Sequence, residues 1–148
     1  MANAQRSTSN VERNGSAVRV REWADAEYGG RRRYDLEDRL LEFAASIVQL
    51  VDLLPNTKAG NHIASQLLRC GTSPLSNHGE VEAAESRRDF LHKLRICLKE
   101  LRETKRWLRL VGRLKLVQGP DLGVCLAETE ELIRIFVASA RTAEKNAR

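Results

Sequence analysis

The chain has 148 residues, of which 42% are hydrophobic, 30% charged and 5% aromatic, and its formal net charge is +5. That length suits one domain with a continuous core, and the apolar fraction excludes a wholly disordered chain. No uninterrupted apolar run reaches the roughly 18 residues of a membrane span, and the polar N-terminal stretch offers no secretory signal. We therefore expect a cytoplasmic protein that has no membrane partner.

The cysteine pattern agrees with a reducing compartment. Cys70, Cys97 and Cys125 are an odd number of single cysteines with no CxxC pair, which argues against a disulfide framework or a zinc site. Few aromatic residues, 3 prolines and 9 glycines favour helices over a β-sandwich. The composition therefore predicts an all-α protein.

The first 34 residues differ from the rest of the chain. They carry seven basic and four acidic residues, lack apolar periodicity and are rich in Ser, Asn, Gly and Arg. Such a segment cannot bury enough apolar surface to offset the entropy of ordering it. We predict a disordered basic tail over residues 1–34 and a folded domain over residues 35–148.

Helical periodicity begins directly after this tail. Apolar residues recur at helical spacing over residues 35–54, where Asp35 is a plausible N-cap and Pro55 ends the pattern. A second helical segment follows over residues 58–85. Gly71, Pro74 and Gly79 lie inside it, so we expect an interruption and a kink near Pro74.

Two further helices complete the domain. Ser86 lies three residues before Asp89, which is typical of an N-cap with a partial capping box, and the third helix is expected to run to about Val111. The Gly119-Pro120-Asp121 turn then separates it from a fourth helix. Four amphipathic helices with short connections predict an antiparallel up-down four-helix bundle.

The third helical segment carries most of the positive charge. Residues 87–115 contain 11 basic and 3 acidic residues. At about 100° per residue, seven of the cations share one face along about 37 Å of helix: Arg88, Arg95, Lys99, Arg102, Arg106, Arg109 and Arg113. This basic face could neutralise several phosphates of RNA or DNA. Because no aromatic residue lies among these cations, binding is expected to be led by phosphates and poorly sequence-specific.

The alternative for the basic face is a solvated surface. Its charges would then be balanced by acidic residues across the bundle, on a second subunit or on another protein. That alternative makes the chain a structural protein–protein interaction module without nucleic-acid binding.

The same helical segment has a second apolar strip, formed by Ile96, Trp107, Leu110 and Leu114. A helix of a monomeric bundle needs one apolar stripe, so the second strip predicts a homo-oligomer interface anchored by Trp107. The alternative is that Trp107 caps the end of the same core.

The sequence offers little for catalysis. Asp89 and His92 could lie on one helical face, but a bundle metal site needs Glu-x-x-His on two helices with further carboxylates, and that motif is absent. No glycine-rich phosphate loop occurs either. We expect no enzyme activity, no catalytic residue, no cofactor and no bound metal.

Long runs of the chain resemble a known family. The run QLLRCGTSPLSNHGEVEAAESRRDFLHKLRICLKELRETKRWLRLV and the later AETEELIRIFVASARTA resemble the bacterial four helix bundle protein family. That family includes proteins encoded in intervening sequences of large-subunit ribosomal RNA genes. The chain is also similar to the accessory variability determinant proteins of diversity-generating retroelements. The resemblance spans about residues 35–145 and includes the Asn77–Glu80 spacing, but departs from the family at Pro74, Leu75, Ser76 and His78.

The resemblance implies an antiparallel bundle that assembles as a homopentameric ring and has no known enzymatic activity. In the retroelement branch it implies a basic barrel that binds a reverse transcriptase and nucleic acid. These are expectations from the family, and the residues by themselves indicate only an oligomer and a basic face.

Overall fold

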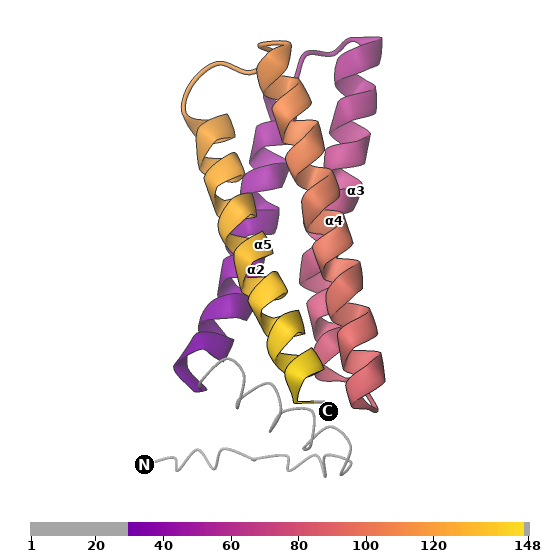
Figure 1. Cartoon of the computed structure of the whole chain (residues 1–148). Coiled ribbons are helices and arrows are strands. Elements are labelled where there is room, and N and C mark those ends of the chain that lie inside the picture. Colours follow the sequence, from indigo (N-terminus) through magenta and orange to yellow (C-terminus); the bar gives the residue numbers. More distant parts are fainter. Residues whose placement is uncertain (1–29, 147–148) are drawn as a thin grey trace, which may run out of the picture.

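The computed structural model describes residues 30–146, and all four regular elements in this range are helices (Figure 1). They are α2 (Gly30–Asp52), α3 (Lys58–Glu82), α4 (Arg87–Arg113) and α5 (Asp121–Lys145). No strand occurs within this described range. The predicted all-α class is confirmed.

Each helix packs against its neighbours in the chain, and α5 packs against α2 to close the bundle. Successive helices run in opposite directions along one long axis (Figure 1). The α2–α5 packing is the least extensive of the four. This arrangement is the predicted antiparallel up-down four-helix bundle.

Phenylalanines from three helices fill the core. Phe43, Phe90 and Phe136 are each at most 1% exposed, and fully buried leucines accompany them. These apolar side chains recur every three or four residues in the chain, so each helix presents one continuous stripe to the bundle axis. Burial of these stripes stabilises helices whose intrinsic propensity alone would leave them marginal in water.

The first helix begins earlier than the sequence predicted. The α2 helix starts at Gly30, so Asp35 is inside the helix and the expected N-cap there is wrong. The last residues of the predicted tail, 30–34, continue the helical backbone, whereas residues 1–29 lie outside the described part of the chain. The arginine-rich segment therefore belongs partly to a helix, because a nucleated helix extends readily into neighbouring polar residues.

The second helix is not broken by its proline. The α3 helix continues through Gly71, Pro74 and Gly79, so the expected interruption is wrong. Pro74 and Gly71 are buried, and packing against the rest of the bundle offsets the lost hydrogen bond at Pro74. Thr57 is its N-cap, with Oγ1 accepting a hydrogen bond from Gly60 N at 3.0 Å.

The start of the third helix is as predicted. Ser86 Oγ accepts a hydrogen bond from Asp89 N at 3.1 Å, and Asp89 Oδ2 accepts one from Glu85 N at 3.2 Å. These two bonds satisfy backbone donors that have no partner inside the helix. The helix ends at Arg113, two residues beyond the expected Val111.

Candidate nucleic-acid interface

All seven residues of the predicted basic face are exposed on α4. Their placement follows from the amphipathic pattern of the helix, because the apolar stripe that includes Leu94, Leu101 and Leu108 is fully buried against the bundle. Burial of that stripe turns the opposite side outward. The basic face is therefore a surface of the folded molecule.

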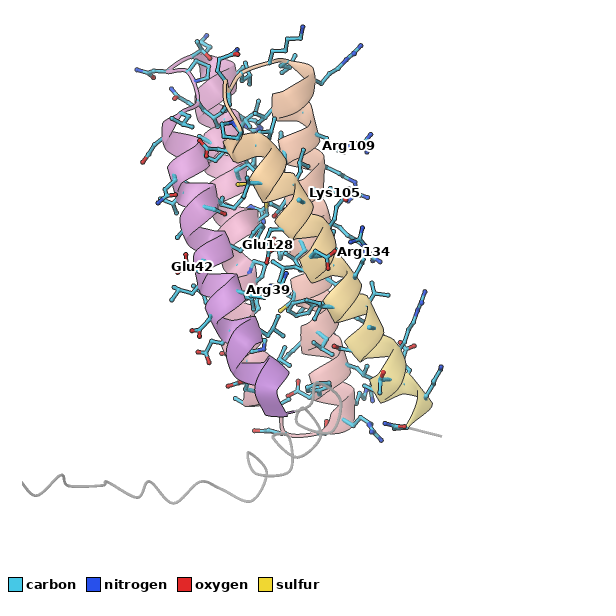
Figure 2. The ribbon with its side chains drawn as sticks, turned by 90° about the vertical axis from the view of Figure 1, so that its left-hand side faces the viewer. Arg39, Glu42, Lys105, Arg109, Glu128 and Arg134 are labelled. Carbon is cyan, nitrogen blue, oxygen red and sulfur yellow. The ribbon has the colours of Figure 1, made fainter. Side chains whose placement is uncertain are left out.

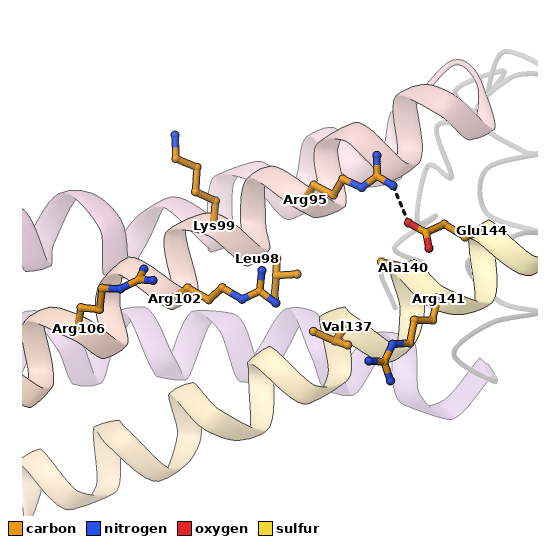
Figure 3. Close-up of a pocket in the computed structure, with 9 residues that line it drawn as sticks. All are labelled: Arg95, Leu98, Lys99, Arg102, Arg106, Val137, Ala140, Arg141 and Glu144. Carbon is orange, nitrogen blue, oxygen red and sulfur yellow. Dashed lines mark hydrogen bonds and ion pairs between the residues drawn. The ribbon is translucent and has the colours of Figure 1, made fainter.

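Part of the basic face lines a groove between α4 and α5 with a volume of about 530 Å³ (Figure 3). The floor is apolar and consists of Leu98, Val137 and Ala140. The charged lining comes from both helices: Arg95, Lys99, Arg102, Arg106, Arg141 and Glu144. Figure 3 shows Arg102 extending along the groove, whereas Lys99 points away from α5.

The groove has an excess of positive charge. Glu144 is the single carboxylate in its lining, and it pairs with Arg95 at 2.5 Å. Within residues 36–146, no carboxylate pairs with Lys99, Arg102 or Arg106. The groove therefore presents several cations whose charge no described acid neutralises.

The two glutamates of α4 nearest to the basic face point to another helix. Arg69 of α3 pairs with Glu100 at 3.4 Å and also with Glu103. Glu100 and Glu103 are therefore occupied on the α3 side. The predicted alternative was a face balanced by acids across the bundle. Within the described part of the chain, Arg95 is the one residue of the basic face that pairs with such an acid.

Lys105 of α4 and Arg134 of α5 lie at one edge of the basic face (Figure 2). Lys105 pairs with Glu130 at 3.0 Å, and Arg134 pairs with Glu130 and Glu131. The hydrogen bond from Lys105 lowers the pKa of Glu130, so this carboxylate stays ionised beside it. The cations at this edge are thus compensated, in contrast to Lys99, Arg102 and Arg106 inside the groove.

Some residues of the predicted basic face line the groove, and others do not. Arg88, Arg109 and Arg113 belong to the exposed basic face but do not line the groove. Arg141 lines the groove but is not among the residues that the sequence predicted. Its signal in the sequence was the seven-residue spacing from Arg134, which places both arginines on one face of the last helix.

The predicted interface strip divides into two parts. Leu110 and Leu114 are 37% and 51% exposed, whereas Ile96 and Trp107 are half-buried. The Trp107 ring packs against the core and meets His62 edge-on at 5.7 Å. Trp107 therefore lies against the core at the junction of α3 and α4 within one chain.

The side chains that could serve catalysis are either buried in the core or bonded at the start of a helix. Cys97 is fully buried, and desolvation raises its pKa to about 12, so the thiol stays protonated at neutral pH. Asp89 accepts hydrogen bonds at the start of α4 and pairs with Lys93 at 3.0 Å. Over the described residues, no three His, Cys, Asp or Glu side chains gather in a metal-binding group.

The helices of the described segment are all too polar or too short to cross a lipid bilayer. Together, the closed bundle and the two-helix groove define a four-helix protein with a cationic surface. The chain belongs to the 23S rRNA-intervening sequence protein family, whose model matches residues 33–138. This match confirms the resemblance seen in the sequence.

A solved structure supports the same assignment. The chain is 34% identical to a protein of unknown function from the S23 ribosomal protein family of Bacteroides thetaiotaomicron. The alignment has a TM-score of 0.67 and covers 73% of this chain and 96% of the other. No curated protein matches the chain.

Proposed function

We propose that this protein is a non-enzymatic, cytoplasmic homo-oligomer whose basic groove binds the phosphate backbone of RNA. The observation that carries the proposal is the set of three groove cations, Lys99, Arg102 and Arg106, that no described carboxylate neutralises. Clustered unneutralised cations attract polyanions and release counterions when these bind. The family name, which refers to an intervening sequence of 23S rRNA, favours RNA over DNA.

The spacing of the groove cations suits a chain of phosphates. Arg95, Lys99, Arg102 and Arg106 follow one another every three or four residues, which corresponds to about 4.5–6 Å of helix rise. Arg141 adds a cation from the facing helix. A backbone lying along the groove could thus meet several cations in succession.

The groove floor predicts weak sequence preference. Leu98, Val137 and Ala140 offer no ring on which a base could stack, and no described aromatic residue lines the groove. Recognition of unpaired bases normally depends on such rings. Affinity should therefore come from the backbone and vary little with sequence.

A salt titration tests this proposal. The affinity for a labelled RNA should fall steeply with salt, and Lys99→Glu/Arg102→Glu should remove at least two phosphate contacts and flatten the slope of log K against log[salt] by about 1.4 or more. The control is Lys58→Glu/Arg134→Glu, which changes net charge equally outside the groove. Undetectable or salt-independent binding by the wild type would overturn the proposal.

The second candidate is a structural module that binds only proteins. The exposure of Leu110 and Leu114 favours it, because contiguous exposed apolar side chains often mark a protein contact. A protein partner that is retained after nuclease treatment would support this candidate. The similarity to the retroelement proteins predicts a different partner, a nucleoprotein such as a reverse transcriptase. Binding of that partner would require both the groove and the nucleic acid.

The oligomer, which the family resemblance leads us to expect as a pentamer, is tested by light scattering. Leu114→Ser is a better probe than Trp107→Ala, because Leu114 is 51% exposed whereas Trp107 packs against the core. Loss of Leu114 should lower the subunit number and leave the helical circular dichroism spectrum of each chain nearly unchanged.

A further inference from the structure

The outer face of α2 is acidic with an apolar centre. Leu41 and Val48 are 53% and 42% exposed. Among residues 36–52, whose side chains the structure describes, the exposed charged residues are all carboxylates: Glu37, Asp38, Glu42 and Asp52. None of them forms an ion pair with a cation in the described part of the chain.

The helical spacing places the acids around the apolar centre. Leu41 and Val48 are seven residues apart and so lie on one side of α2. Glu37 and Asp38 precede Leu41 by four and three residues, and Asp52 follows Val48 by four. Residues at these spacings are surface neighbours on a helix, so the acids form a rim. We call this surface the acidic α2 face.

The last turns of α4 carry the opposite arrangement. The exposed Leu110 has Arg106 four residues before it, Arg113 three residues after it and the exposed Leu114 four residues after it. Neither arginine has an ion-pair partner among residues 36–146. An apolar centre with a basic rim therefore stands on α4, and we call it the basic α4 end.

The two surfaces cannot meet within one chain. Helix α2 packs against α3 and α5, whereas α4 packs on those same two helices from the opposite corner of the bundle. In Figure 2, Glu42 extends from the α2 side and Arg109 from the opposite, α4 side. Each surface is thus available only to another molecule.

We propose that the acidic α2 face of one copy docks on the basic α4 end of a second copy. This inference rests on the proposed homo-oligomer and identifies the surfaces that form it. Leu41 and Val48 would cover Leu110 and Leu114, while the two charged rims pair around them. Because the two surfaces differ, the contact is heterologous, and repeating it closes a ring or extends a filament.

The proposal also separates assembly from RNA binding. The basic α4 end uses the Arg106–Leu114 part of the helix and shares Arg106 with the groove, whereas Arg95, Lys99 and Arg102 lie nearer the start of the helix and stay exposed in the groove. Substitutions on α2 should therefore change the subunit number without removing any groove cation.

The first test is Leu41→Ser/Asp38→Lys, measured by size-exclusion chromatography with light scattering. The expected result is a shift from the oligomer to the monomer mass of 16.7 kDa. The matched control is Val124→Ser on α5, since Val124 is 60% exposed but belongs to neither surface. Far-UV circular dichroism checks that all variants remain folded.

The second test is a charge swap. Glu37→Lys/Asp38→Lys and Arg106→Glu/Arg113→Glu should each dissociate the oligomer, because like charges then face one another. The quadruple variant should assemble again, since its rims are complementary with reversed sign. Failure of that restoration in folded protein would overturn the proposed pairing.

The remaining outcomes separate this inference from the proposed function. A wild type that assembles but tolerates both α2 variants would overturn the pairing and leave the oligomer standing. A monomeric wild type overturns the pairing outright and leaves the acidic α2 face for a basic partner or solvent. RNA binding is measured separately with groove variants, so its failure leaves the assembly result intact.

Discussion

Arg39 of α2 and Glu128 of α5 form a two-point ion pair, with Nε to Oε1 at 2.9 Å and Nη2 to Oε2 at 3.1 Å. The pair crosses the least extensively packed side of the bundle (Figure 2). The side chains of Arg39 and Glu128 are 30% and 31% exposed. Two parallel hydrogen bonds between planar groups restrict both the distance and the orientation of the two helices.

Loss of this pair should weaken the closure of the bundle. We expect Glu128→Gln to lower the free energy of unfolding by about 0.5–1 kcal/mol, because the pair is well oriented but partly solvated. Urea unfolding measures the change. The control is Glu131→Gln, whose partner Arg134 lies on the same helix, and an equal loss in this control would contradict a special role for Glu128.

Two glycines of α3 should respond to alanine with opposite signs. A Cβ atom at Gly71 would lie 2.7 Å from Ile47 Cγ2, whereas nothing lies within 4 Å of a Cβ at Gly79. Gly71→Ala should destabilise the protein by about 1–3 kcal/mol through overpacking. Gly79→Ala should stabilise it by about 0.5–1 kcal/mol through helix propensity.

Thermal and urea unfolding of both glycine variants test this contrast. Ile47 is fully buried, so it has little freedom to move away from the new methyl group. A Gly71→Ala variant as stable as the wild type would show that α2 and α3 can separate locally without cost.

The buried Cys97 thiol should make stability sensitive to alkali. Its pKa is raised from 9.0 to about 12, so the folded state holds its proton at a pH where the unfolded chain loses it. The contribution is complete below pH 9 and is lost as the pH rises toward 12. Cys97→Ala should be less stable at pH 7, because it leaves a small cavity, but should lose less stability between pH 9 and 12.

Thiol labelling checks the same group independently. All three cysteines are buried, so we expect no rapid labelling of the native protein at pH 8 and three labelled thiols in denaturant. Rapid native labelling of Cys97 would contradict its burial in the core.

Protonation of Asp89 should lower the stability of the protein at acidic pH. The hydrogen bond with Lys93, followed by that from the Glu85 N–H, lowers the pKa of Asp89 from 3.8. A lowered pKa in the folded state means that the contribution is present above the unfolded value and is lost as the pH falls through the folded one. Asp89→Asn should therefore flatten the decline of stability below pH 4, as measured by urea unfolding. An unchanged decline would show that this end of α4 is not responsible.

Local pattern was sufficient for the elements and the fold class. The helical repeats, the Ser86 cap and the basic face on α4 all depend on residues close together in the chain, and the structure confirms each of them. The sequence predicted the boundaries and the continuity of the helices less accurately. The start of α2 at Gly30 and the uninterrupted helix through Pro74 depend on cooperative extension and on packing, which no local signal reports.

The sequence by itself determined that four amphipathic helices would bury their apolar faces and leave a line of cations outside, because periodicity decides which side of a helix faces water. Only the tertiary structure decided what lies beside that line. Arg141 and Glu144 reach the groove from α5, and Arg69 draws Glu100 and Glu103 toward α3. The bundle also sets the acidic α2 face opposite the basic α4 end, because α2 and α4 occupy diagonal corners and never pack on each other extensively.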